Sequence, residues 1–345
     1  MKKLSAFVCL LLVISLIFTA ACGKTTTDTD QGKQENAAKE EKPIVIKYAT
    51  VGPDEHQYTI ASRKFKEIIE EKSGGKIKVE LFPNAQLGGE REMAEGVKMG
   101  TIQMTTVTSD GALPAWVPET QIFSIPYLFR DREHAYKAMD GELGKILAEK
   151  FEKQGFKHLG FVELGFRHFT NNKREIKEPA DMKGLKIRVQ EAPIWFALIE
   201  SLGATATPIA FNELYSALQQ GVVDGQENPL ATIRSMKFYE VQKYLTLDAH
   251  TYAPGSVLIN LQFFNSLPEE YQKLIVEAVD EMKVYQRNYI AQKAEDDLKF
   301  LKEQGMIVTE PDRDKFVEAT KDIPYKEEVK KLVPPELVEL VRNIE

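Results

Sequence analysis

Residues 44–82, IVIKYATVGPDEHQYTIASRKFKEIIEEKSGGKIKVELF, decide the fold class of this chain. Residues 44–51 and 77–82 are short apolar runs with the composition of buried strands. Between them, residues 58–72 carry apolar side chains at helical spacing, and residues 73–75 (SGG) supply a stop signal. A strand, a helix and a second strand in succession form the unit of an α/β fold, so the sequence predicts helices that cover sheets.

The alternation of strand and helix continues along the chain. Further strands are predicted at residues 103–108, 157–164, 185–189 and 222–226, and further helices at residues 90–99, 133–154, 193–202 and 212–220. After Ser266, which we interpret as forming a capping box with Glu269, one helical pattern runs to Gly305. At 1.5 Å per residue this helix reaches roughly 55 Å. We therefore expect it to lie across the two domains that the chain length suggests.

The N-terminal residues are typical of an exported lipoprotein. Two lysines and an apolar run precede small residues and Cys22, which predicts a signal peptide over residues 1–21 and a lipid on Cys22. An ordinary signal peptide with an incidental cysteine, or an uncleaved anchor helix, are the alternatives. Residues 23–42 lack large apolar side chains, which predicts a flexible tether over residues 22–43. The other cysteine, Cys9, lies in the signal, so we expect no disulfide in the mature protein.

Composition and motifs exclude several classes of function. The formal net charge of -7 argues against a nucleic-acid partner. The chain has no zinc-hydrolase, nucleophile-elbow, Walker or dinucleotide-binding motif, and its five histidines show no metal-ligand spacing. We therefore expect a protein that is not an enzyme and that uses no cofactor and no metal.

Arg188 is the first candidate binding residue. In residues 185–189 (LKIRV) the apolar residues alternate, so Arg188 points to the opposite face near the carboxyl end of the strand. Ligands of open α/β folds bind beyond such strand ends. A guanidinium there can hold a carboxylate with two parallel hydrogen bonds, and the N-terminus of the helix expected at Pro193 also favours an anion. A surface arginine on an edge strand is the alternative.

Two further residues could complete such a site. Arg167 follows a predicted strand between aromatic residues, and a second cation there could help to neutralise a carboxylate; a salt bridge at the rim is the alternative. Asn228 precedes Pro229, a pattern that favours a helix cap. Its amide could instead both donate to and accept from a ligand.

Seven segments match, in order, the pattern of one family. They are residues 82–88 (FPNAQLG), 123–127 (FSIPY), 181–189 (DMKGLKIRV), 203–211 (GATATPIAF), 214–219 (LYSALQ), 223–229 (VDGQENP) and 237–244 (KFYEVQKY). From residue 44 to about residue 305, the chain resembles the substrate-binding proteins of tripartite ATP-independent periplasmic (TRAP) transporters, the DctP-like group.

The resemblance implies a fold and its lobes. It implies an α/β, two-lobe fold like that of the type II periplasmic binding proteins, with the lobes joined by crossover strands and the long helix. Lobe I would comprise residues 44–165 plus 254–293. Lobe II would comprise residues 166–253 plus 294–345. The lobes would close on a small organic carboxylate.

The family pattern also assigns residues. It matches Arg188 to the arginine that clamps the substrate carboxylate, and it matches Arg167 and Asn228 to further binding positions. Glu191, Ser109 and His56 complete the candidate substrate-binding set. The chain departs from the pattern after Val189, where the family commonly has proline and this chain has Gln190 followed by Glu191. An acid so close to the clamp would repel a second carboxylate unless it is turned away or paired.

The implied partners are a TRAP membrane permease with small and large subunits and the membrane itself, through the lipid. The resemblance places the protein outside the cytoplasm, anchored to the cell membrane or in the periplasm. An ABC-type binding protein, a sensory receptor and an extracellular enzyme are the competing functions. Which carboxylate is bound stays open, and the serine and aspartate at 109 and 110, where sialic-acid-binding relatives carry an acid, weaken the case for sialic acid.

Overall fold

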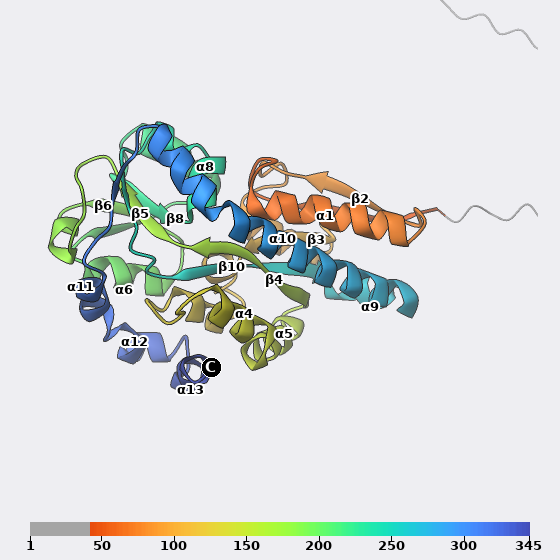
Figure 1. Ribbon diagram of the computed structural model, residues 1–345. Helices are drawn as coiled ribbons and strands as arrows, with labels where there is room; N and C mark the ends of the chain where they lie inside the picture. The colour runs from red at the N-terminus through yellow and green to blue at the C-terminus, as the bar shows by residue number, and fades with distance from the viewer. Residues whose placement is uncertain (1–41) are drawn as a thin grey trace, which may run out of the picture. The chain divides into compact units, whose positions relative to one another are not determined.

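The computed structural model describes residues 42–345. The predicted signal peptide, the predicted lipidation site at Cys22 and the predicted tether up to residue 41 lie outside the described residues. The described part is an α/β protein with two sheets, surrounded by helices (Figure 1).

The first sheet has five strands in the order β2-β1-β3-β10-β4. They are β1 (Ile44–Ala49), β2 (Ile77–Phe82), β3 (Met104–Thr108), β4 (Phe156–Phe166) and β10 (Tyr252–Asn260). The strand, helix and strand predicted over residues 44–82 are confirmed, because β1 and β2 pair in parallel and α1 (Gln57–Lys72) connects them. The face of α1 that carries Ala61, Phe65 and Ile69 is fully buried.

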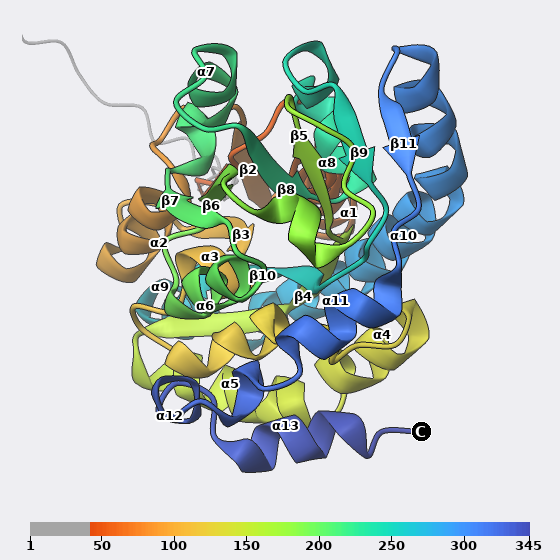
Figure 2. The ribbon, with the colours of Figure 1, turned by 90° about the vertical axis from the view of Figure 1, so that its left-hand side faces the viewer.

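The second sheet has six strands in the order β11-β9-β5-β8-β6-β7 (Figure 2). They are β5 (His168–Asn171), β6 (Lys186–Val189), β7 (Thr205–Pro208), β8 (Gly225–Asn228), β9 (Tyr244–Thr246) and β11 (Ile307–Thr309). The chain passes from the first sheet to the second within one residue, because only Arg167 separates β4 from β5. It returns between β9 and β10.

The remaining elements are helices. The α-helices are α2 (Glu90–Met99), α3 (Ser109–Ala112), α4 (Arg132–Asp140), α5 (Glu142–Lys153), α6 (Pro193–Ser201), α7 (Leu214–Gln219), α8 (Leu230–Ser235), α9 (Leu261–Ser266), α10 (Glu269–Glu303), α11 (Arg313–Thr320), α12 (Glu327–Lys330) and α13 (Pro335–Arg342). Short 3₁₀ helices lie at Pro118–Ser124, Pro179–Met182, Phe211–Glu213, Phe238–Glu240 and Ile323–Tyr325.

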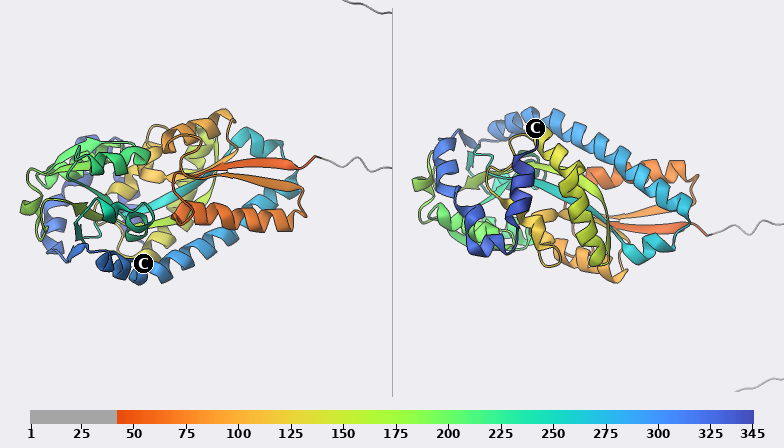
Figure 3. Two further views of the ribbon diagram at one scale, coloured as in Figure 1. Left: turned by 90° about the horizontal axis from the view of Figure 1, so that it is seen from above. Right: turned by 90° about the horizontal axis from the view of Figure 1, so that it is seen from below.

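The long helix α10 spans elements of both sheets, as expected (Figure 3). Its 35 residues pack against α1 and β4 on one side of the crossover and against α8 on the other. The apolar side chains of Ile275, Val279 and Met282 are fully buried. Near its C-terminal end, the Arg234 guanidinium of α8 lies 2.9 Å from the Asp297 carboxylate of α10.

Three local predictions are wrong. The helix expected over residues 133–154 is two helices, because Gly141 takes an extended ψ of -144° that ends α4. Ser266 does not cap the long helix: its hydroxyl donates back into α9, which it closes, and Pro268 occupies the N-cap position of α10. Asn228 is no helix cap either, because it lies in β8, paired with β5.

The predicted lobe bounds stay a prediction. The end of the chain bears on them, because α13 packs against α5. In addition, Nε2 of His134 in α4 lies 2.9 Å from the carbonyl oxygen of Val341. The last helix therefore lies against helices of the predicted lobe I.

Candidate functional site

Arg188 lies near the carboxyl end of β6, two residues before the turn that leads into α6. Its side chain is only 3% exposed. Nε donates to the carbonyl oxygen of Ile209 at 2.9 Å, and the guanidinium lies 5.9 Å from the centre of the Phe211 ring. Nη1 is buried and has no hydrogen-bond partner among residues 42–345. A buried donor without a partner is rare in folded proteins and calls for an explanation.

The electrostatics of Arg188 follow from this burial. Burial lowers the pKa of its guanidinium to about 10, although Glu227 opposes the effect. The side chain is therefore still a cation at neutral pH, and among residues 42–345 no carboxylate forms an ion pair with it. Such a group gains strongly from an anion placed beside it.

Arg167 is equally buried but has a carboxylate partner. Its guanidinium forms an ion pair with Glu227, in which Nη2 donates to Oε1 at 2.8 Å and to the backbone carbonyl at 2.7 Å. Nη2 also donates to Oδ1 of Asn228 at 3.1 Å, and the Trp195 ring centre lies 5.3 Å away. Burial lowers the pKa of Arg167, but Glu227 outweighs it and leaves the pKa raised. The charge of Arg167 is thus already neutralised within the protein.

The pair extends to a buried histidine. Nε2 of His250 lies 3.3 Å from Oε2 of Glu227, and Nδ1 lies 2.7 Å from Oδ2 of Asp248. Burial lowers the pKa of His250, but Asp248 and Glu227 outweigh it and raise the pKa to about 9. At neutral pH the cluster therefore contains the cations Arg167 and His250 against two carboxylates.

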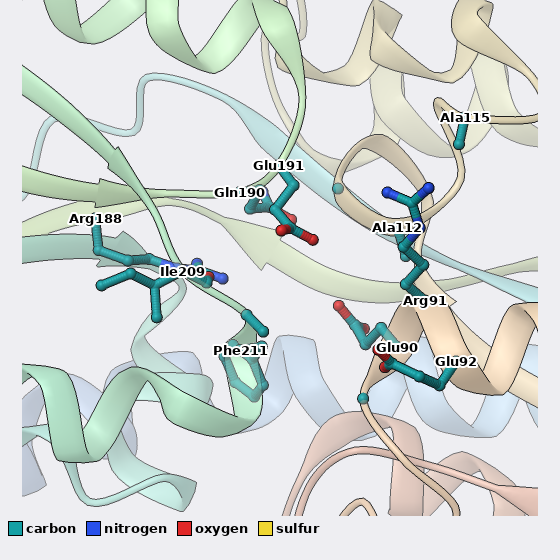
Figure 4. Close-up of a pocket in the computed structure, with 13 residues that line it drawn as sticks. Glu90, Arg91, Glu92, Ala112, Ala115, Arg188, Gln190, Glu191, Ile209 and Phe211 are labelled. Carbon is teal, nitrogen blue, oxygen red and sulfur yellow. The ribbon is translucent and has the colours of Figure 1, made fainter.

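Two adjoining cavities meet at Arg188. The inner cavity is lined among others by Arg188, Arg167, Asn228 and His56. The outer cavity opens between α2, α3 and the loops that follow β6 and β7 (Figure 4). Four residues line both of them: Glu90, Arg188, Gln190 and Phe211. Arg188 therefore lies where the two cavities adjoin.

His56 lines the inner cavity as a neutral group. It caps α1, where its Nδ1 accepts from the backbone N–H of Tyr58 at 3.2 Å. Burial lowers the pKa of His56 to about 3, so the ring is uncharged at neutral pH. Because Nδ1 accepts, the proton resides on Nε2, which makes this atom a hydrogen-bond donor.

The other two candidates lie elsewhere. Glu191 is exposed and lines the outer cavity only. Ser109 lines neither cavity: its buried hydroxyl contacts the carbonyl oxygen of Pro254 at 3.1 Å and the Ser256 hydroxyl at 2.8 Å. The structure thus brings Arg188, Arg167, Asn228 and His56 to one cavity, but it does not bring Ser109 there.

Sequence reasoning missed four residues of this site. Glu90 and Gln190 line both cavities, Phe211 lies under Arg188, and Glu227 neutralises Arg167. Only Glu227 had a usable signal, because it is an acid inside a short strand segment next to Asn228. Glu90 and Phe211 come close to Arg188 only because α2 and the loop after β7 line the same cavity, and nothing in the sequence marks Gln190 as a cavity residue.

Residues 48–331 match the family model described as "Bacterial extracellular solute-binding protein, family 7", DctP. The chain belongs to this family. A "Solute-binding protein" of Verminephrobacter eiseniae is 44% identical to this DctP-family chain over 264 residues, covering 75% of the chain and 78% of the relative.

Solved structures agree with the assignment. A TRAP periplasmic solute-binding protein from a Polaromonas species, bound to D-erythronate, superposes on the DctP-family chain with a TM-score of 0.84 at 37% identity, covering 88% of this chain and 99% of that one. A TRAP periplasmic solute-binding protein from Sulfurospirillum deleyianum with bound succinate has a TM-score of 0.84 at 31% identity, with 88% and 100% covered.

These matches confirm the resemblance and the fold class. The DctP-family chain is a TRAP-type solute-binding protein with the two-lobe fold, and its family is one of extracellular solute-binding proteins rather than enzymes. Within residues 42–345, no helix combines the length and the apolar character that spanning a bilayer requires. In the same residues, no cluster of three or more potential ligands is placed to hold a metal ion.

Proposed function

We propose that this protein captures a small organic carboxylate with Arg188 and hands it to the membrane permease of a TRAP transporter. One observation carries the proposal: the buried guanidinium of Arg188 borders the cavities with an Nη1 donor that has no partner. Arg167, in contrast, is satisfied by Glu227. A ligand carboxylate is the group that would satisfy Arg188, with two parallel hydrogen bonds.

The other lining groups suit the same ligand. Nε2 of His56 supplies a neutral donor, and the Asn228 amide keeps one N–H and one oxygen lone pair beyond its bonds to Gln226 and Arg167. Arg167 acts as the residue that positions Asn228. The relatives whose structures contain D-erythronate and succinate support a small organic acid as the ligand of this chain.

Binding would be coupled to closure of the two lobes. The predicted bounds, 44–165 plus 254–293 and 166–253 plus 294–345, place one boundary at the last residue of β4, directly before Arg167. Closure around a bound acid removes water from the site, which strengthens the attraction between Arg188 and the carboxylate. The permease would then recognise the closed form.

The protein would work at the outer face of the cell membrane. A signal peptide over residues 1–21, a lipid on Cys22 and the tether up to residue 43 would keep the binding domain near the permease. Intact-mass measurement of membrane-extracted protein should show the acylated cysteine as the N-terminus. Cys22→Ser should release the protein from the membrane, and an unmodified wild-type cysteine would contradict the anchor.

A binding screen tests the proposed function. Protein comprising residues 43–345 is mixed with sugar acids, hydroxy acids, 2-oxo acids, C4-dicarboxylates and aromatic acids, and each acid that raises the melting temperature is then titrated by calorimetry. We expect one class to bind with a stoichiometry of one. Mass spectrometry should recover the ligand unchanged after incubation. Turnover of the ligand, or binding of no acid, would reject the proposal.

A further inference from the structure

A second unpartnered donor lies next to Arg188. Gln190 follows β6, is 5% exposed, and lines both cavities. Its Nε2 atom is buried and donates to no group within the part of the chain that the structure describes. An amide N–H needs a hydrogen-bond acceptor when it is buried. Because Gln190 lines both cavities, a ligand bound there could supply that acceptor.

The Gln190 side chain occupies the space beside Gly111 that a Cβ atom would need. A Cβ atom on Gly111 would lie 1.8 Å from Oε1 of Gln190 and 2.7 Å from its Cδ. Any larger residue at position 111 in α3 would therefore displace the amide. The amide position is thus built into the packing of α3 against the loop after β6.

Glu90 supplies the opposite hydrogen-bonding character. Its Oε1 accepts from the backbone N–H of Thr108 at 2.8 Å and from the Thr108 hydroxyl at 2.9 Å. These two bonds fix the carboxylate of this half-buried side chain on the wall of both cavities. A carboxylate keeps further acceptor sites after two hydrogen bonds, so Glu90 can accept from a ligand donor.

The charges around the outer cavity oppose a second ligand carboxylate. Besides Arg188, its lining includes the carboxylates of Glu90, Glu92 and Glu191 and one other cation, Arg91. In Figure 4 the Glu90 carboxylate lies across the cavity from Arg188, and the Glu191 carboxylate points into the space between them. Arg91 is exposed, and its Nε lies 3.5 Å from a Glu95 oxygen. The acidic side chains therefore dominate the region beyond Arg188.

We propose that Gln190 and Glu90 make the site selective for a hydroxylated monocarboxylic acid, such as an aldonic acid, over an unsubstituted dicarboxylic acid. This inference rests on the proposed function, in which Arg188 takes the carboxylate. A hydroxyl group both accepts and donates, so the hydroxyl groups of such a ligand can accept from the Gln190 amide and donate to the Glu90 carboxylate. A second carboxylate could accept from Gln190, but Glu90 and Glu191 would repel it.

Calorimetry with matched acids tests this selectivity. The probes are C4 to C6 aldonates, their carbon-matched deoxy monocarboxylates, and succinate. The best aldonate should bind at least about a hundredfold more tightly than its deoxy analogue and than succinate, because a site built to bond a hydroxyl rejects ligands that lack it. Glu90→Gln and Gln190→Met should each weaken aldonate binding at least about tenfold, and both should reduce the preference for the aldonate over its deoxy analogue.

Controls and outcomes separate this inference from the proposed function. Glu149→Gln and Gln220→Met change exposed residues outside both cavities, and they should bind like the wild type. If succinate binds most tightly and Arg188→Met abolishes its binding, the selectivity is refuted while the carboxylate clamp stands. Unchanged aldonate affinity in Glu90→Gln and Gln190→Met also refutes it. If Arg188→Met leaves aldonate binding intact, both ideas fall.

Discussion

Replacing Arg188 by methionine should change stability and binding in opposite directions. Methionine fills a similar volume without charge. Burial lowers the Arg188 pKa to about 10, and at about 1.4 kcal/mol per pKa unit this corresponds to a cost on the order of 3 kcal/mol in the ligand-free protein. Because the folded-state pKa is depressed, this cost is fully present at neutral pH, where both states keep the proton.

The variant also loses one favourable contact. The hydrogen bond from Nε to the carbonyl of Ile209 contributes roughly 1 kcal/mol. We therefore expect Arg188→Met to raise the free energy of unfolding of the ligand-free protein by about 2 kcal/mol. Urea unfolding of residues 43–345 at pH 7 measures this change.

Ligand affinity should fall in the same variant. Breaking a buried ion pair costs roughly 3–5 kcal/mol, which predicts a loss of two or more orders of magnitude by calorimetry. Arg188→Lys should also bind poorly, because a point charge cannot reproduce the forked guanidinium. Arg63, whose side chain is 52% exposed, provides the control, since Arg63→Met should change neither quantity much. Wild-type affinity in Arg188→Met, or a clear loss of its stability, would refute the reasoning.

Three further outcomes follow from the buried network. Glu227→Gln leaves the Arg167 guanidinium buried without its carboxylate, so urea unfolding should show a loss of roughly 3–5 kcal/mol, whereas Glu95→Gln should stay within about 0.5 kcal/mol of the wild type. The His250 pKa is raised to about 9, so protonation of this residue stabilises the protein fully below its unfolded-state pKa, and the contribution disappears as pH rises through 9. Between pH 6 and pH 10 the wild type should therefore lose about 3 kcal/mol of unfolding free energy that His250→Gln does not lose; parallel curves for the two proteins would exclude this assignment. Gly111→Ala should displace Gln190 and weaken binding of the preferred acid in calorimetry, yet add little further loss in a Gln190→Ala background.

The architecture was predictable because its signals are local. The apolar runs of β1 and β2 and the helical spacing of α1 lie within 39 consecutive residues, 44–82, and tertiary packing does not override them. The prediction of one helix over residues 133–154 failed at Gly141. A single glycine within a helical pattern can be tolerated, so the sequence alone did not show that the helix ends there. Asn228 misled it because the pair Asn-Pro is a local cap signal, whereas pairing of β8 with β5 is decided elsewhere in the chain.

The site was predictable only in part, because its key distinction is not local. Arg167 follows a strand and Arg188 lies near the end of one, so the sequence gives no reason to assign them different roles. What separates them is Glu227, which pairing of β8 with β5 brings beside Arg167 and not into contact with Arg188. Gln190 and Glu90 were missed as ligand contacts for the same reason, since 100 residues of chain separate them and only the cavity wall unites them.

The two arginines therefore have separate roles. A buried cation that is already neutralised contributes little attraction to a ligand, because its field is cancelled within a few ångströms. Arg167 is such a cation, and its place between β4 and β5 makes its pair with Glu227 a link between the two sheets. Arg188 is the opposite case: it is buried, charged and short of a partner. A buried charge without a partner gains free energy when the carboxylate of a ligand binds beside it. The same unpaired charge lowers the stability of the ligand-free fold.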